Sequence, residues 1–324
     1  MLNHHTTKIL PAKTDKKALT STLSLLACEA LLVVAWSSGF VGARFSIDYT
    51  SAFLVVFWRC VLVTVILFPF VISQLRHTSL ATIALNAGIG LLAMAGYLAG
   101  VVKGIELGVS AGLAALMADL LPIGTALLAL IFMRQKPANV VWIGLLLGVG
   151  GVLMVSWSSL SWKAVPLWAY ALPLLGMLSL AGATLLQKQF QPSAPLNLTT
   201  TLWLQSAASS LAFAIFVGMQ EPLLPEISRG FTLSVLWTGL FSTFGGYGLY
   251  WFCLQRTSAV RVTSVLFLSP PVTLLWAWAM FDEPLSWSML AGMAVSLLGI
   301  GMVIKGDSGK PSKIFRFMRR YRPF

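Results

Sequence analysis

Three ionisable side chains interrupt stretches of the sequence that are otherwise apolar. They are Glu29, Arg59 and Asp119, and each lies inside an apolar run of about 20 residues, the length of a helix that spans a bilayer. An ionised group at the centre of such a helix costs about 2.5 to 3.5 kcal/mol on insertion scales, so it usually binds a solute, carries a proton or pairs with another charge. These three residues are therefore the first candidates for chemistry.

Arg59 and Asp119 are predicted to lie at similar depths in the membrane. At a rise of about 1.5 Å per residue, Arg59 lies about 10 Å and Asp119 about 14 Å from the outer ends of their helices, so the two side chains can meet. Asp119 is then a structural partner of Arg59, a proton carrier, or a contact for a substrate cation. Arg59 either anchors its helix by reaching toward the outer interface or binds a substrate carboxylate.

Glu29 lies about 9 Å from the inner end of the first predicted helix, close enough for its side chain to reach the surface. This position favours a solvated or paired structural role. Glu29 also shares a helical face with Trp36, seven residues later, so a vestibule on the cytoplasmic side is the alternative.

Aromatic and amide side chains form a second group of candidates. Tyr and Trp combine flat apolar surface with a polar tip, which suits a pocket for amphipathic molecules and allows cation–π contacts. The alternative is the interfacial belt, which must take up many of the 12 tryptophans. Within a polar stripe on the seventh predicted helix, Gln205 is favoured over its neighbours. The candidates are Trp36, Tyr97, Trp203, Gln205, Tyr247 and Tyr250.

Prolines inside two of the apolar runs are candidate hinges. Pro122 removes the helical donor for the carbonyl of Ala118 and predicts a bend beside Asp119. Pro270 and Pro271 occupy the corresponding place near the end of the chain. A bend beside a buried acid is suited to a gate.

The composition requires a membrane environment for these candidates. The chain of 324 residues is 57% apolar and only 10% charged, and its mean hydropathy is +0.85. One soluble core cannot hide so much apolar surface, so the expected fold is an all-α polytopic membrane protein. Ten transmembrane helices are predicted, at residues 23–43, 52–72, 82–102, 110–132, 139–156, 166–187, 197–218, 232–254, 259–280 and 286–304.

The sequence contains an internal repeat. Residues 110–155 align without a gap on residues 258–303, with 11 identities in 46 positions. The alignment pairs Pro122 with Pro270, and it repeats the order of a proline-containing helix, a short break and a glycine-spaced helix. The predicted organisation is a tail (1–22), a first five-helix repeat (23–157), a second five-helix repeat (166–304) and a basic tail (305–324).

The distribution of basic residues predicts the orientation. Seventeen Lys and Arg residues lie on the side that holds both tails and four on the other, so both termini are expected in the cytoplasm. Five helices is an odd number, so the second repeat must then cross the membrane in the sense opposite to the first. Inverted repeats of this kind build two gates around one midplane site in many secondary transporters.

Several of these features together resemble one known family. The run Trp36-Ser-Ser-Gly-Phe-Val-Gly-Ala-Arg44, the arginine Arg59, the run Gly112-Leu-Ala-Ala-Leu ahead of Pro122 and the paired repeat ends are similar to those of the EamA-type drug/metabolite transporter superfamily. The resemblance covers residues 25 to 304 approximately. It implies a ten-helix inverted-repeat fold with a central cavity, and relatives that export amino acids, drugs, pigments and other small metabolites.

The sequence therefore predicts a secondary exporter of small metabolites or drugs in a bacterial inner membrane, working by alternating access, with proton exchange through Asp119 as a hypothesis. An uncoupled facilitator is the alternative, and a membrane-embedded enzyme acting on lipid is disfavoured because no catalytic cluster or cofactor motif occurs. No cofactor, metal or nucleic acid is expected. The expected partners are a small-molecule substrate and membrane lipids, and the chain is expected to be a monomer or a homodimer.

Overall fold

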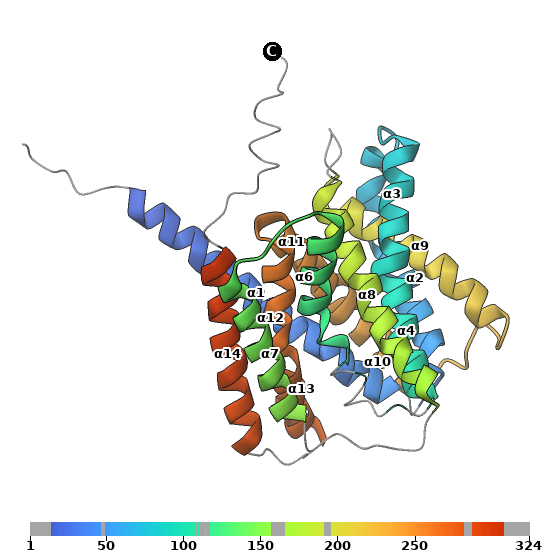
Figure 1. Ribbon diagram of the computed structural model, residues 1–324. Coiled ribbons are helices and arrows are strands. Elements are labelled where there is room, and N and C mark those ends of the chain that lie inside the picture. Colours follow the sequence, from blue (N-terminus) through green and yellow to red (C-terminus); the bar gives the residue numbers. More distant parts are fainter. Residues whose placement is uncertain are drawn as a thin grey trace, which may run out of the picture.

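The computed structural model describes residues 14–46, 49–107, 109, 114, 117–156, 166–190, 196–281 and 287–307. Within these residues every regular element is a helix (Figure 1). Most of the two predicted tails, most of the run 112–116 and the break at 282–286 lie outside the described residues. The first helix begins at Thr14, nine positions before the apolar run that the sequence marks at Leu23.

The helices follow the order that the repeat predicts. The first half contains α1 (Thr14–Ser46), α2 (Ala52–Leu75), a continuous rod of α3 (Leu80–Gly90), η1 (Leu91–Gly96) and α4 (Tyr97–Glu106), then α6 (Leu121–Phe132) and α7 (Asn139–Ser156). The second half contains α8 (Leu167–Gln189), α9 (Leu198–Gly218), a rod of α10 (Arg229–Trp237), η3 (Thr238–Tyr247) and α11 (Gly248–Arg256), then α12 (Ala259–Val265), η4 (Leu266–Leu268), α13 (Ser269–Phe281) and α14 (Trp287–Asp307).

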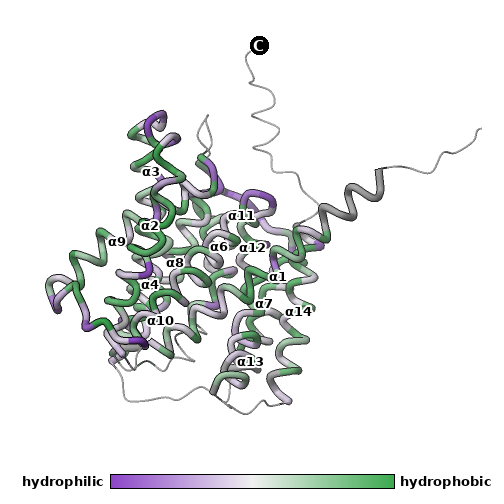
Figure 2. The backbone as a smooth tube through the Cα atoms, turned by 180° about the vertical axis from the view of Figure 1, so that it is seen from behind, coloured by the Kyte–Doolittle hydropathy of each residue, from purple (hydrophilic) through white to green (hydrophobic). Residues whose placement is uncertain are grey.

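The lengths and hydropathy of these helices identify a multi-pass membrane protein. Six segments of the described chain are long and apolar enough to cross a bilayer, namely 23–43, 53–75, 80–104, 167–189, 198–218 and 259–280. Three shorter apolar helices accompany them, at 121–132, 139–154 and 290–306. Figure 2 shows apolar residues along the helices and most polar residues toward the turns.

Helices at corresponding places in the two halves pack together and run antiparallel. α2 packs extensively against α9. Near one end of this pair the rings of Phe53 and Phe213 lie 5.7 Å apart, and near the other end the Gln74 side-chain oxygen accepts a hydrogen bond from the Asn197 backbone, 3.2 Å long. The chain direction of α9 is therefore opposite to that of α2.

The second such pair, α7 and α14, forms one edge of the bundle (Figure 1). A Cβ atom on Gly144 would lie 2.6 Å from the carbonyl oxygen of Gly299, and one on Gly151 would lie 2.5 Å from that of Gly292. Glycine lets the two backbones touch. The repeat alignment pairs Gly144 with Gly292 and Gly151 with Gly299, so each contact is the counterpart of the other.

Two further contacts between the halves also correspond to each other under the repeat. α1 packs against η3, and α4 packs against α8, which stands in the second half where α1 stands in the first. Gly100 of α4 meets the backbone of α8, because a Cβ atom there would lie 2.5 Å from the carbonyl oxygen of Leu172. These two crossings hold α4 of the first rod and η3 of the second against the centre of the molecule, where the largest buried cluster lies.

Candidate functional site

Trp36 of α1 lies at the centre of an aromatic cluster drawn from both halves of the chain. Its ring centroid lies 5.1 Å from that of Tyr247, 5.5 Å from that of Tyr250 and 6.1 Å from that of Tyr97. All four side chains are at least nine-tenths buried. The sequence named these four residues as candidates, and the structure brings them together; we call them the aromatic cluster.

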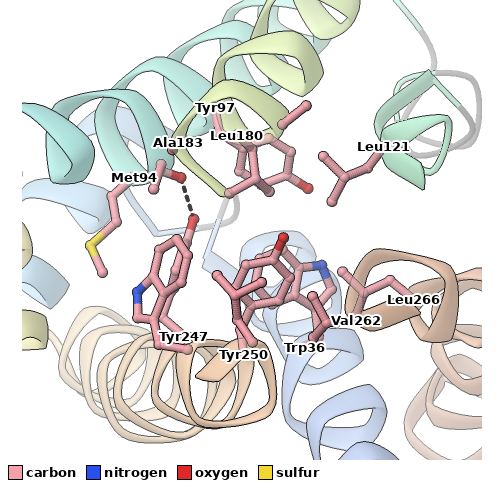
Figure 3. Packing of buried hydrophobic residues seen from close by; sticks show 14 of the residues in the cluster. Trp36, Met94, Tyr97, Leu121, Leu180, Ala183, Tyr247, Tyr250, Val262 and Leu266 are labelled. Atoms are coloured by element: carbon pink, nitrogen blue, oxygen red, sulfur yellow. Dashed lines mark hydrogen bonds between the residues drawn. The ribbon is translucent and has the colours of Figure 1, made fainter. Parts of the chain in front are cut away.

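Close helix packing positions the cluster. Gly42 of α1 lies against the junction of α10 and η3, because a Cβ atom there would lie 2.6 Å from the Trp237 ring and 2.7 Å from the Thr238 methyl group. On the opposite side Tyr97 and Leu121 face Trp36 and Tyr250 (Figure 3). The cluster is thus enclosed by α1, α4, α6 and the rod that contains η3 and α11.

Two π-helical segments accompany the cluster, and they occupy corresponding places in the two halves. η1 ends at Gly96, directly before Tyr97, and η3 ends at Tyr247. The Tyr247 hydroxyl donates a 2.9 Å hydrogen bond to the carbonyl oxygen of Ala93, which lies inside η1 (Figure 3). π-Helical turns are rare and recur at functional sites. Sequence reasoning missed both segments.

The polar tips of the cluster fall into two groups. The Tyr250 hydroxyl donates to Thr184 Oγ1 at 2.6 Å, because the single hydroxyl proton of Thr184 is already given to the carbonyl oxygen of Leu180. Tyr247 is likewise satisfied. The Trp36 indole and the Tyr97 hydroxyl form no hydrogen bond with the described part of the chain, so these two tips remain available to a ligand or to water.

Arg59 and Asp119 lie beside the cluster. Arg59 is 5% exposed and Asp119 is 6% exposed. Both side chains lie near Tyr97, and Arg59 also lies near Tyr247. Within the described residues no ion pair or hydrogen bond joins Arg59 to Asp119, and Arg59 Nε is buried with no hydrogen-bond partner. The direct pair that similar depths allow is therefore not formed.

Glu29 has a different environment, about two turns before Trp36 on α1. Its carboxylate oxygens accept hydrogen bonds from Nε and Nη2 of Arg261 at 2.9 and 3.1 Å. The Glu29 side chain is 4% exposed and that of Arg261 is 15% exposed. Of the two interpretations of Glu29, the structure supports the paired structural role, and the partner ties α1 to α12.

Two further candidates lie outside the aromatic cluster. The Trp203 indole donates to the carbonyl oxygen of Thr64 at 2.9 Å and packs on Phe68, so this side chain belongs to the α2–α9 contact. Gln205 donates from Nε2 to Gln187 Oε1 at 3.0 Å, and its own Oε1 is buried without a hydrogen-bond partner. Sequence reasoning missed Gln187 and Thr184 of α8. Gln187 bonds to Gln205, and Thr184, one turn earlier on α8, bonds to Tyr250.

The predicted hinges lie where helices are broken. Asp119 and Leu120 form a turn, and Pro122 stands in the first turn of α6 directly after it. Pro270 and Pro271 stand in the first turn of α13, after the 3₁₀ segment η4. Proline fits the first turn of a helix because its missing N–H has no intrahelical acceptor there. Motion at these positions stays a prediction.

Comparison with known proteins relates this arrangement to transporters. The family model described as the EamA-like transporter family matches residues 23–157 and 167–305. The chain is 26% identical over 286 residues to a chloroplastic WAT1-related protein of Arabidopsis thaliana, covering 83% of this chain and 66% of that protein. It is 25% identical over 287 residues to an uncharacterized transporter of Archaeoglobus fulgidus, covering 85% of this chain and 97% of that protein.

A solved crystal structure shares the fold. It superposes with a TM-score of 0.72 and covers 88% of this chain and 99% of the other, at 13% sequence identity. This likeness concerns the arrangement of helices alone.

Proposed function

The chain belongs to the EamA-like transporter family, and from this premise we propose that it exports small amphipathic metabolites, amino acids included, from the cytoplasm. The aromatic cluster with Arg59 and Asp119 is the proposed substrate site. The observation that carries the proposal is the pair of buried, opposite charges that hold no ion pair with the described residues and border unbonded aromatic tips.

The proposed mechanism is alternating access between two inverted five-helix repeats that cross the membrane ten times. Support comes from the antiparallel packing of α2 with α9 and of α7 with α14, because equivalent helices run antiparallel only when one repeat is inverted relative to the other. The site then lies where the two repeats meet. Both repeats contribute to it, with Trp36 and Tyr97 from the first and Tyr247 and Tyr250 from the second.

The proposed direction and location rest on the charge distribution. Seventeen basic residues on one side against four on the other favour cytoplasmic termini. We place the protein in a bacterial inner membrane, with the ends of α1, α10 and α13 that carry Phe45, Arg229 and Met280 on the outer side.

The chemistry of the proposed site suits a solute that carries charge and an apolar body. The Arg59 guanidinium offers donors to a carboxylate. The Asp119 carboxylate attracts an amine, which the rings of Trp36 and Tyr97 also favour through cation–π contacts. A zwitterionic solute pairs both buried charges at once, so binding removes the penalty that the empty site carries.

Asp119 is also the proposed coupling residue. A buried carboxyl without a cation partner exchanges a proton when no amine is bound, so proton uptake and substrate binding compete for one group. Such competition exchanges an inward proton for an outward substrate. An uncoupled facilitator has no need of this carboxyl, so the Asp119→Asn variant distinguishes the two mechanisms.

The proposal is tested by solute counterflow into liposomes that contain the purified protein. Four radiolabelled classes are compared: amino acids with apolar side chains, lipophilic amines, nucleosides and sugar phosphates. We expect only the first two classes to accumulate, and we expect both to be recovered chemically unchanged. Accumulation of amino acids is expected to be lost in Arg59→Gln and in Asp119→Asn. Accumulation of sugar phosphates alone, accumulation unaffected by both variants, or chemical conversion of the solute contradicts the proposal.

A further inference from the structure

An apolar pocket lies on the flank of the molecule, away from the aromatic cluster. It encloses about 330 Å³ between α1, α10, η3 and α13. All nine lining residues are apolar or glycine, and they include Phe45, Leu233, Leu236, Leu240, Phe241 and Met280. None of the charged candidates of the proposed substrate site contributes to it.

The back wall offers no free polar group. Trp237 is the one lining side chain with a polar atom, and its indole N–H donates to the carbonyl oxygen of Ser38 at 2.9 Å. Its ring stands edge-on to that of Trp276, with centroids 5.7 Å apart. Gly42 completes the wall from α1, where glycine lets the backbone reach the Trp237 ring. The pocket therefore presents an almost wholly apolar lining to its contents.

The mouth of the pocket is exposed where the protein meets the bilayer. Leu233 is 57% exposed, Phe241 is 54% exposed and Met280 is 45% exposed. Val41 and Met280 belong to two segments of membrane-spanning length. Apolar side chains exposed at this depth face lipid hydrocarbon, so the available filling is an acyl chain.

A cation stands at the polar end of the same helical face. Arg229 is the first residue of α10, is exposed, and has no ion pair or hydrogen bond with the described residues. Leu233 and Leu236 follow it in α10 at intervals of 4 and 7, which places all three on one helical face, and Leu240 of η3 lines the same pocket. The three leucines lie about 6 to 16 Å deeper along the helix. Tyr49 packs on Gly230 beside Arg229, as an interfacial aromatic ring does.

We propose that this flank binds one glycerophospholipid, with its phosphate on Arg229 and one acyl chain in the pocket. The order of a cation, an interfacial ring and a hydrocarbon-lined pocket along one helical face matches the order of groups along the lipid. The bound lipid stabilises the contact between α1 and α10. This inference is independent of the proposed substrate and of proton coupling.

The test uses a photoactivatable phosphatidylglycerol whose diazirine lies in the acyl chain, in phosphatidylcholine vesicles that contain the full-length protein. Mass spectrometry locates the labelled peptides. We expect labelling to concentrate on residues 233–241 and 41–45. Leu236→Trp fills the pocket and removes this labelling, and Arg229→Gln lowers it about fivefold, the effect of one basic residue near an anionic lipid surface.

Two matched variants serve as controls. Leu211→Trp places the same large ring on an exposed position of α9, and Arg76→Gln removes a basic residue at the other end of the bundle. Both are expected to label like the wild type. Native mass spectrometry gives a second measurement, the amount of lipid that co-purifies with Arg229→Gln and with Arg76→Gln. Neither of these variants introduces a tryptophan, so an effect of that ring on folding cannot influence the comparison.

Three outcomes overturn the proposal. Labelling spread evenly over all lipid-facing helices shows annular contact only. Labelling of residues 233–241 that is unchanged in both Leu236→Trp and Arg229→Gln shows that neither feature selects the lipid. Displacement of the label by a transported amine shows a lateral entrance for substrate instead of a lipid site.

Discussion

Two sets of buried charge in this protein differ in one respect: one is paired and the other is not. Glu29 and Arg261 join α1 to α12 through two hydrogen bonds and satisfy each other. Arg59 and Asp119 are equally buried, yet neither holds an ion pair with a described residue. A buried charge without a partner destabilises the fold, so its presence calls for a reason outside the fold.

The comparison separates structure from function within one membrane environment. A buried charge that is paired needs no ligand to account for it, because each partner compensates the other's loss of hydration. A buried charge that is unpaired, beside aromatic side chains with unbonded polar atoms, is explained by a solute or a proton that binds there and neutralises it. The variants below test this distinction, because the two sets respond to substitution in opposite ways.

The largest expected effect is the loss of coupled transport in Asp119→Asn. The amide cannot take up a proton and cannot attract an amine as a carboxylate does. In proteoliposomes, we expect export of the substrate found by counterflow to lose its dependence on an imposed pH gradient. An Asp119→Asn protein whose pH-driven rate equals that of the wild type rules out the coupling role.

The next effect breaks the paired set. Glu29→Leu leaves Arg261 buried without a partner and is expected to lower stability by about 3 kcal/mol, the lower end of the range for buried pairs because Arg261 keeps some exposure. The double variant Glu29→Leu with Arg261→Leu is expected to recover most of this loss. Thermal unfolding in detergent measures both. A double variant less stable than the single one contradicts the pairing.

A third prediction concerns the crossing that positions Tyr97. Gly100→Ala places a Cβ atom against the backbone of α8, which cannot yield, so we expect a loss of about 2 kcal/mol. Gly88 in the same rod has no atom within 4 Å of an added Cβ. Gly88→Ala is therefore the control, with stability unchanged or raised by up to about 1 kcal/mol. Equal effects of the two substitutions would show that the close α4–α8 contact is wrong.

The smallest effect compares two tyrosines of the aromatic cluster. Tyr247→Phe removes the hydrogen bond to Ala93 and is expected to lower stability by about 1 kcal/mol. Tyr97→Phe removes a hydroxyl that bonds to no described residue, so stability stays within about 0.5 kcal/mol while substrate affinity falls. Melting curves and equilibrium binding separate the two roles, and a reversed order refutes them.

Much of this fold was predictable because hydropathy and internal repeats in the sequence of a membrane protein indicate where its helices lie. Alternation of long apolar runs with short polar breaks predicted six helices that match the six long apolar segments of the described chain. The alignment of residues 110–155 with 258–303 paired the two helices that are α7 and α14 in the structure, but their mutual contact was not predicted. The aromatic cluster was also predictable in composition. Trp36, Tyr97, Tyr247 and Tyr250 lie in predicted helices and combine flat apolar surface with a polar tip, which is why they were candidates.

The rest depended on how helices rotate and where they deviate from regular geometry. Depth alone allowed Arg59 to meet Asp119, but contact also requires facing directions, which the sequence does not encode locally. The π-helical segment that precedes Tyr97 and the one that ends at Tyr247 change the phase of each rod by adding residues to a turn, and apolar runs without a breaker give no sign of them. Trp203 was assigned to the same site, yet it packs on α2.

The central claim is that Arg59 and Asp119 are kept unpaired for a ligand, and the most direct test is the melting temperature of Asp119→Asn with and without the transported solute. The account predicts that the empty variant melts at or above the wild-type temperature, because a buried unpaired charge is gone, and that the solute no longer raises it. A variant that melts well below the wild type, as Glu29→Leu should, and is still stabilised by the solute would contradict it.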